Sequence, residues 1–327
     1  METSLYPLKF EPILKDKIWG GTRLKTMLYK EISPANCCGE SWEVSGLVGD
    51  ESMITNGFLA ENNLNELLEI YMTELVGEKN YEKYGLGFPL LIKFIDAQDN
   101  LSVQVHPNDE LAQRKYGQSG KTEMWHVIAS EPGSGLYVGF NKTVSKAQFE
   151  EAIANGTVEE VLQFYPVQPG DTFMIPAGTV HAIGKGVLLA EIQQPSDITF
   201  RVFDWNRLDD EGNSRELHVQ EALEAIDFNH QTDNFKVEYQ PQLNKTVRLV
   251  RSQYFNTSLL EFDQPLNKSF VEIDSFVIYM CLDGQILLAY GDERERLETG
   301  EVVLIPAEME EVQLLPARKS KVLEVYC

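Results

Sequence analysis

The feature of this sequence that most constrains its fold is an internal repeat. Residues 170–177 read Gly-Asp-Thr-Phe-Met-Ile-Pro-Ala, and residues 300–307 read Gly-Glu-Val-Val-Leu-Ile-Pro-Ala, an offset of 130. Each copy combines a glycine turn, a short apolar strand and a proline turn before the next strand. Because self-similarity of this kind indicates one structural unit used twice, we expect two β-barrels of the same type.

The rest of the chain agrees with a mainly β fold. Short runs with apolar residues at alternate positions recur between glycine and proline turns, which is typical of barrels and sandwiches. Helical spacing of apolar residues predicts additional α-helical segments at 60–78, 144–165 and 215–227. The polar stretch 228–245 looks like a connection, so we expect an N-terminal unit at 1–240 and a C-terminal unit at 241–327.

Histidines are present only in the first of these units. In the repeat alignment His181 falls on Glu311, and no histidine follows His230. The C-terminal unit is therefore predicted to be a degenerate copy without a metal site.

The segment 101–109, Leu-Ser-Val-Gln-Val-His-Pro-Asn-Asp, has the period of a β-strand. Its polar side chains Ser102, Gln104 and His106 share one face, and Pro107 then ends the strand pairing. An amide oxygen and an imidazole two positions apart on one face can both reach a metal ion.

The next predicted strand, 121–128, and the strand after the turn 176–178 supply further ligands. Glu123 shares a face with Lys121 and Trp125, and His181 directly follows the turn. Neighbouring strands lie about 5 Å apart, so facing side chains can meet one ion. The predicted metal ligands are Gln104, His106, Glu123 and His181. This donor set suits one Zn²⁺ per chain with an open coordination position, although Mn²⁺ or Fe²⁺ accept the same ligand types.

Other histidines and the nearby cations have different expected roles. His126 is three positions from Glu123, which places it on the opposite face as a packing or surface residue, and His218 and His230 are expected to be unremarkable. Lys121 lies on the ligand face and Trp125 is expected to form a wall of the pocket. Two arginines, Arg201 and Arg207, are placed to meet a phosphate or an enediolate oxygen.

Composition excludes several classes of partner. The formal net charge of −23 argues against nucleic acids and anionic membranes, and it requires a site for an anion to supply its own cations. The sequence contains neither an apolar run of about 18 residues nor a signal-peptide pattern. The four cysteines are poorly spaced for disulfides or a cysteine-rich zinc site. We therefore expect a cytoplasmic protein that acts on a small molecule, as a monomer or weak homodimer.

Four motifs, in this order, resemble those of the type I mannose-6-phosphate isomerases. They are Gln104–Asp109, Gly120–Glu123, Pro176–Ala182 and Gln193–Asp204. The resemblance covers most of the chain, and the length is similar to that of the shorter bacterial branch. It implies two cupin-type jelly-roll β-barrels, the first of them catalytic. It also implies zinc-dependent interconversion of mannose 6-phosphate and fructose 6-phosphate through a cis-enediol(ate).

The resemblance also implies roles for individual residues. The predicted ligands match the zinc ligands of the family, and Arg201 matches its catalytic arginine. Lys121 and Ser102 match substrate-site positions, and Glu191 resembles an acidic active-site residue. The expected catalytic residues are Arg201, Lys121 and Glu191, and the expected substrate-binding residues are Ser102, Lys121, Trp125 and Arg207. The residue that acts as proton-transfer base is left open.

Two other functions are compatible with a cupin metal site. A metal-dependent oxygenase would use similar ligands, but it would not require cations that suit a phosphorylated substrate. A non-catalytic cupin that binds sugar phosphates would have no need for a complete ligand set. Turnover of mannose 6-phosphate, with and without a chelator, separates these functions from the isomerase.

Overall fold

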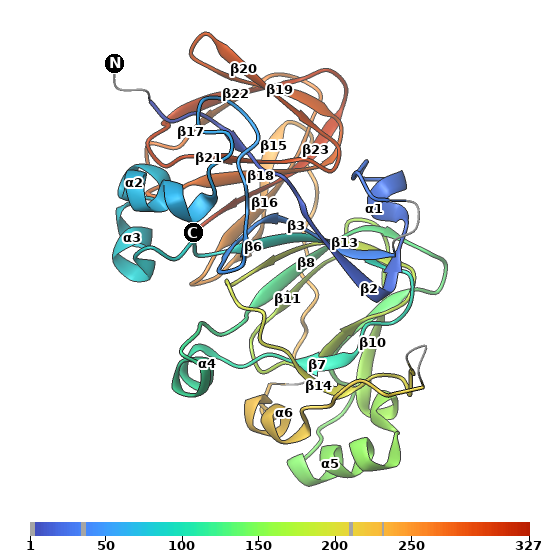
Figure 1. The fold of residues 1–327 in the computed structure, drawn as a ribbon. Coiled ribbons are helices and arrows are strands. Elements are labelled where there is room, and N and C mark those ends of the chain that lie inside the picture. The colour runs from blue at the N-terminus through green and yellow to red at the C-terminus, as the bar shows by residue number, and fades with distance from the viewer. Residues whose placement is uncertain (1–3, 34–36, 209–211, 231) are drawn as a thin grey trace.

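The computed structural model describes residues 4–33, 37–208, 212–230 and 232–327 and consists mainly of antiparallel strands (Figure 1). They form two units, each made of two sheets that enclose an apolar core. The sheets remain separate, so each unit is a cupin-like sandwich rather than the closed barrel that the sequence predicted. The predicted fold class, mainly β with additional helices, is confirmed.

The N-terminal unit contains a six-stranded and a five-stranded sheet. The first has the order β11-β8-β13-β6-β2-β3, at Thr172–Ile175, Glu123–Ser130, Val187–Gln193, Leu91–Ala97, Ile13–Gly21 and Cys38–Val44. The second has the order β10-β9-β12-β7-β14, at Leu162–Pro166, Gly135–Phe140, His181–Ile183, Val103–Val105 and Phe200–Phe203. A separate small hairpin pairs β4 and β5, at Gly46–Leu47 and Asp50–Glu51.

The C-terminal unit contains a six-stranded and a four-stranded sheet. The first has the order β1-β21-β18-β23-β16-β15, at Leu8–Lys9, Val302–Ile305, Val277–Asp283, Ser320–Tyr326, Asn256–Phe262 and Lys245–Arg251. The second has the order β17-β22-β19-β20, at Leu266–Ser269, Glu311–Pro316, Gln285–Tyr290 and Glu293–Glu298.

The internal repeat predicted from the sequence is confirmed by the sheet order. Strand β11 and strand β21 start and end 130 residues apart, and each lies beside the equivalent strand, β8 or β18. The orders β11-β8-β13-β6 and β21-β18-β23-β16 then correspond strand for strand. The two copies therefore share one topology, and a residue of one can be matched to a residue of the other through the strand register.

The helices lie at the margins of the sheets. They are α1 at Arg23–Thr26, α2 at Leu64–Val76, α3 at Glu78–Tyr84, α4 at Asp109–Tyr116, α5 at Lys146–Asn155 and α6 at Val219–Ala225, with a 3₁₀ turn at Val158–Val161. Helix α2 begins at a capping box formed by Asn63 and Glu66, which satisfies the free amides of its first turn. Helices α5 and α6 lie at the end of the molecule away from the C-terminal unit (Figure 1).

The helix predicted at 144–165 is too long. Helix α5 ends at Asn155 because Gly156 takes the left-handed conformation, with φ of 68°, and caps it. Leu162, which the helical spacing included, instead begins strand β10.

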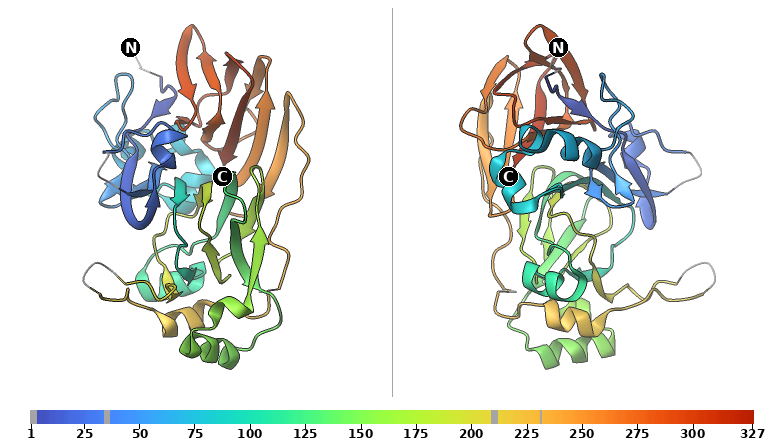
Figure 2. Two further views of the ribbon diagram at one scale, coloured as in Figure 1. Left: turned by 90° about the vertical axis from the view of Figure 1, so that its right-hand side faces the viewer. Right: turned by 60° about the vertical axis from the view of Figure 1, so that its left-hand side comes forward.

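The two units are joined by more than the connecting segment. Strand β1, at the start of the chain, pairs with β21 of the C-terminal unit, so it crosses the predicted division at residue 240. One apolar cluster contains residues of both units, among them Leu8, Leu64, Phe94, Ile278 and Leu323. Figure 2 shows the units in contact along this face. All four cysteines are free, and no described helix is both long and apolar enough to span a membrane.

Candidate active site

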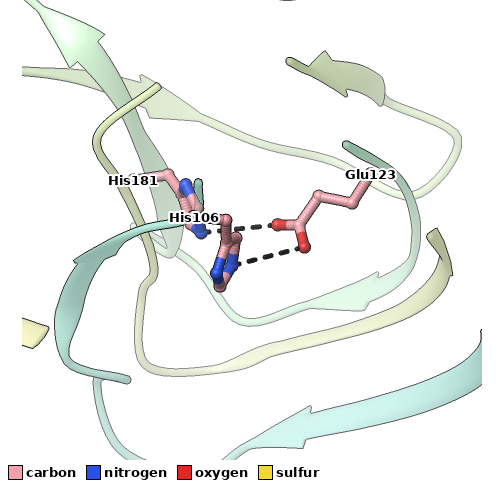
Figure 3. Close-up of side chains that lie close together, drawn as sticks. All are labelled: His106, Glu123 and His181. Carbon is pink, nitrogen blue, oxygen red and sulfur yellow. Dashed lines mark ion pairs between the residues drawn. The ribbon is translucent and has the colours of Figure 1, made fainter. Parts of the chain in front are cut away.

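Three buried side chains converge inside the N-terminal unit, as Figure 3 shows. His106 Nε2 lies 3.6 Å from Glu123 Oε2, and His181 Nε2 lies 3.4 Å from Glu123 Oε1. The ligand atoms of all three residues lie within 4.8 Å of one another. These are three of the four metal ligands predicted from the sequence.

The strand register places the fourth predicted ligand beside them. Gln104 on β7 is the direct cross-strand partner of His181 on β12. Its amide nitrogen lies 3.3 Å from His181 Nε2, and because an amide can rotate, the same side chain can present its oxygen there. The structure thus brings all four predicted ligands together.

Hydrogen bonds orient both imidazoles toward Glu123. The Nδ1 atom of His106 lies 2.8 Å from the carbonyl oxygen of Ile198, and that of His181 lies 2.8 Å from the carbonyl oxygen of Thr179. A carbonyl only accepts, so each Nδ1 carries the proton and each Nε2 keeps a free lone pair. Burial, followed by the charge of Lys121, lowers the pKa of His106 well below its usual value and that of His181 to about 4.

Glu123 is fully buried, and its charge needs compensation. Neither of its oxygens receives a directed hydrogen bond from the described residues, although the ammonium of Lys121 lies 2.7 Å from Oε2. Lys121 Nζ also lies 3.1 Å from His106 Nε2. A buried carboxylate with unused lone pairs, facing two neutral imidazole nitrogens, is a donor set that fits a divalent cation.

A row of alternating charges leads from this cluster along the floor of a cleft. Distances between successive partners are 3.9 Å for Lys121–Glu191, 3.6 Å for Glu191–Lys93, 3.6 Å for Lys93–Glu40 and 3.2 Å for Glu40–Lys17. Burial, followed by the charge of Glu123, raises the pKa of Glu191. Burial opposes the charge of Lys121, but Glu123 and Glu191 outweigh it and raise the pKa of this lysine. A row of this kind is costly to bury unless each charge has its partner.

The cleft has a volume of about 170 Å³ and is lined by five of the residues that the sequence analysis singled out. They are Ser102, Gln104, Lys121, Glu191 and Arg201. Arg201 is held in place because its Nε donates to Ser102 Oγ at 3.2 Å and its Nη1 donates to the carbonyl oxygen of Glu216 at 2.8 Å.

Two predicted substrate-binding residues lie elsewhere. Trp125 is fully buried beneath the cleft, where its Nε1 donates to Glu191 Oε2 at 2.8 Å and its ring packs edge-on against His181. Arg207 donates to the carbonyl oxygen of Asn100 and to Asp204, both at 2.8 Å, and does not line the cleft. Trp125 faces the inside of the sandwich as predicted, but its cross-strand partner Glu191 lines the cleft and Trp125 does not.

The remaining histidines lie away from the three convergent side chains. His126 is buried on the other face of β8, with its Nδ1 2.8 Å from Thr172 Oγ1, as the strand period predicted. His230 is exposed. His218 was expected to be unremarkable, but its Nδ1 accepts from the backbone N–H of Arg201 at 3.3 Å and so helps to position that strand.

Five charged residues that line the cleft were missed by the sequence reasoning. They are Lys17, Glu40, Lys93, Asp197 and Arg215. One signal was available, since Lys93 is a lysine in the middle of an otherwise apolar strand and is buried. The others depend on which strands and loops become neighbours.

A larger cavity, of about 620 Å³, lies between the N-terminal segment and the C-terminal unit. It is lined mostly by acidic and apolar side chains and contains the buried ion pair Lys30–Glu43, 2.7 Å apart. None of its lining residues is a histidine or cysteine, and both of its lysines pair with glutamates of the same cavity, Lys9 with Glu301 and Lys30 with Glu43. We therefore assign the chemistry to the smaller cleft, where potential metal ligands and cations meet.

Comparison with known proteins identifies the family of the chain. Residues 7–127 match the model of the phosphomannose isomerase type I catalytic domain, and residues 245–317 match that of the mannose-6-phosphate isomerase cupin domain. The chain is 34% identical over 311 residues to mannose-6-phosphate isomerase ManA of Bacillus subtilis, covering 94% of this chain and 95% of that one. It is 33% identical to mannose-6-phosphate isomerase of Streptococcus mutans, covering 92% of each.

Solved structures show the same fold. The crystal structure of mannose 6-phosphate isomerase from Bacillus subtilis superposes with a TM-score of 0.87 at 30% identity, over 98% of this chain and 99% of that one. A putative mannosephosphate isomerase from Archaeoglobus fulgidus, at 20% identity, has a TM-score of 0.79 over 100% of this chain and 99% of that one. From the motifs, the fold and the similarity over nearly its whole length, the chain belongs to the type I phosphomannose isomerase family.

Proposed function

We propose that this protein interconverts mannose 6-phosphate and fructose 6-phosphate through a cis-enediol(ate), with one Zn²⁺ per chain. The observation that carries the proposal is the convergence of His106 Nε2, His181 Nε2 and the Glu123 carboxylate at one end of a cleft lined by cations. Relatives at 33–34% identity over more than nine-tenths of the chain are named for this activity.

The donor set supports zinc as the metal. His106, His181 and Glu123, with the amide oxygen of Gln104, would provide two nitrogens and two oxygens, and the buried site limits the water that competes for them. A bound Zn²⁺ would act as a Lewis acid that polarises the substrate carbonyl.

Side chains of the cleft would move the proton between the two carbons of the substrate. An aldose–ketose isomerisation moves one proton from C2 to C1 and one from O2 to O1, so it needs no oxidant or reductant. Glu191 lines the cleft and lies within 3.9 Å of Lys121. We assign Glu191, as a carboxylate, to the transfer between the two carbons. Lys121, held in its charged form by two carboxylates, is assigned to donate a hydrogen bond to the substrate oxygens.

Arg201 would stabilise negative charge that develops during the reaction. Its guanidinium is already fixed by Ser102 and the Glu216 carbonyl, so little reorganisation is needed when charge appears. Ser102 lines the same part of the cleft and can donate its hydroxyl hydrogen to the substrate.

The test is a coupled assay in which purified protein is mixed with mannose 6-phosphate and the formation of fructose 6-phosphate is followed. A chelator should abolish turnover, and added Zn²⁺ should restore it. No turnover in the metal-loaded protein would exclude the isomerase. We also propose a cytoplasmic location, where sugar phosphates are found, and a monomer or weak homodimer, which light scattering across a concentration series can check.

A further inference from the structure

The cations that line the cleft fall into two groups. The three lysines, 17, 93 and 121, lie 3.2, 3.6 and 2.7 Å from buried carboxylates and are therefore neutralised along the floor. The two arginines, Arg201 and Arg215, are compensated far less. This contrast is notable in a chain with a net charge of −23, where unpaired positive charge is scarce.

Arg201 forms no ion pair with a carboxylate of the described residues, although the charges of Asp204 and Glu216 act on it from farther away. Its side chain donates to a hydroxyl and to a backbone carbonyl, which are neutral. Burial and then the nearby charge of Arg215 lower its pKa, which indicates that the two guanidinium groups lie close together.

Arg215 lies near the carboxylate of Asp204, but Arg207 lies closer to the same carboxylate. Its Nη1 lies 3.5 Å from Asp204 Oδ1, whereas Arg207 Nη2 lies 2.8 Å from the same oxygen. The side chain of Arg215 is 32% exposed and lines the cleft, while that of Arg207 is only 14% exposed and does not. Arg207 therefore holds Asp204 in place, and Arg215 remains available to an anion.

The strand register gives the distance between this arginine pair and the proposed metal ligands. His181 on β12 faces Gln104 on β7, and Gln104 faces Arg201 on β14. Arg201 is therefore one strand spacing, about 5 Å, from Gln104, and two spacings, about 10 Å, from His181. Arg215 precedes Glu216, whose carbonyl oxygen accepts from Arg201, so it belongs to the same end of the cleft. That separation is comparable with the length of an extended six-carbon sugar chain with a phosphate at its far end.

We propose that Arg215, together with the hydroxyl of Ser102, binds the phosphate group of the substrate, that Arg201 lies between this site and the proposed metal ligands, and that Arg207 positions the site through Asp204. The inference rests on the proposed function for the identity of the sugar, but the chemistry it names is recognition of a phosphate dianion. A guanidinium fork matches phosphate oxygens in a bidentate manner, and the Ser102 hydroxyl can add a donor.

The test compares R215Q with wild type and with R318Q, which removes one exposed positive charge from the C-terminal unit. We would measure binding of inorganic phosphate and of fructose 6-phosphate by titration calorimetry, and KM and kcat for mannose 6-phosphate. R215Q should weaken both ligands and raise KM about 10- to 100-fold, because a charged hydrogen-bond partner is lost. Its kcat should change less, since the phosphate does not react. R318Q should behave like wild type, and R215K should recover part of the loss.

Several results would overturn the proposal. They are unchanged phosphate binding in R215Q, an equal effect in R318Q, or a larger loss of phosphate binding in R207Q than in R215Q. Unphosphorylated fructose is the internal control, because R215Q should not alter any binding of it. Calorimetry does not depend on turnover, so a wild-type protein that binds phosphate through Arg215 but does not isomerise would refute the proposed function and leave this inference standing.

Discussion

Replacing Lys121 with methionine tests the electrostatics of the proposed metal centre. In the structure this ammonium lies 2.7 Å from Glu123 Oε2 and 3.1 Å from His106 Nε2, and both partners are buried. In protein stripped by a chelator, Lys121 is therefore the positive charge closest to Glu123. A divalent ion bound by His106, Glu123 and His181 would supply a positive charge beside Glu123 in its place. In the metal-loaded protein the replacement of Lys121 should therefore lower the melting temperature much less.

The size of the effect follows from burial. Removing one partner of a buried ion pair costs about 3–5 kcal/mol. Unfolding 327 residues as one unit, at about 2.1 cal/mol/K per residue, has an entropy of roughly 0.7 kcal/mol/K. Stripped K121M should therefore melt about 4–7 °C below stripped wild type, and the gap should shrink to less than about 2 °C once Zn²⁺ is restored. Zinc should also bind K121M more tightly, because no ammonium has to leave Glu123.

The assay is a thermal melt of both proteins, stripped and reloaded, with zinc affinity measured against a chromophoric chelator. K93M is the matched control, because Lys93 is also buried but pairs with Glu40 and Glu191 rather than with Glu123. Its loss of stability should be the same with and without zinc. An equal loss in both forms of K121M, or no loss in the stripped form, would refute this account of Lys121.

Three further predictions concern single residues. H106A and H181A should each lose most of the zinc that elemental analysis finds in wild type, whereas H126A, on the other face of β8, should retain it; normal zinc in the first two would contradict the ligand assignment. R201A should keep its zinc but lose about 10²- to 10³-fold in kcat, as expected for the removal of a group that stabilises developing charge, and a fully active variant would remove Arg201 from the mechanism. Burial, followed by the charge of Lys321, lowers the pKa of His126 from 6.5 to about 3, so between these values the unfolded chain binds a proton that the folded protein does not. Stability should therefore fall as the pH drops from 6.5 toward 3, and H126Q should lose part of that dependence in urea unfolding at pH 5 and pH 7; an unchanged slope would contradict the assignment.

The convergence of the proposed metal ligands could be predicted because it depends largely on local rules. The period of a strand puts Gln104 and His106 on one face, and the proline turn before His181 begins the strand that pairs with them. The same period separated His126 from Glu123 correctly. Strands β7 and β12 are neighbours in one sheet, whereas β8, which carries Glu123, belongs to the other sheet, so the site also depends on how the two sheets face one another.

The charged residues that line the cleft beside the proposed metal ligands could not be predicted in this way. The contacts of Glu40 with Lys93, and of Lys93 with Glu191, exist because β3, β6 and β13 are adjacent, and no pattern within any one strand reveals that order. Arg215 lines the cleft and Arg207 does not. Both lie after β14 in irregular chain, where no periodicity restricts the direction of a side chain. Trp125 was placed on the correct face, but sequence alone does not show that it donates to Glu191 and leaves the cleft to be lined by that acid.

Comparison of the two copies separates what the fold requires from what the proposed chemistry adds. Through the register of β11 with β8 and of β21 with β18, Glu123 corresponds to Val277 and Trp125 to Tyr279. Pairing with β13 and β23 then matches Glu191 to Glu324.

The hydrogen bond from the aromatic residue to the acid is present in both copies, at 2.8 Å from Trp125 to Glu191 and at 2.6 Å from Tyr279 to Glu324. Since the second copy has a valine, Val277, at the position of Glu123, this bond does not depend on the proposed metal ligand and belongs to the packing of the sandwich. Each acid has an ammonium nearby, since Lys268 lies 2.8 Å from Glu324. What distinguishes Glu191 is that it meets two buried lysines, Lys93 and Lys121. Lys93 corresponds to Ser258 in the other copy. The proposed reactivity of Glu191 should therefore be sensitive to Lys93 and Lys121, while a Trp125→Tyr change, which keeps an aromatic donor, should be tolerated far better than either lysine replacement when kcat is measured.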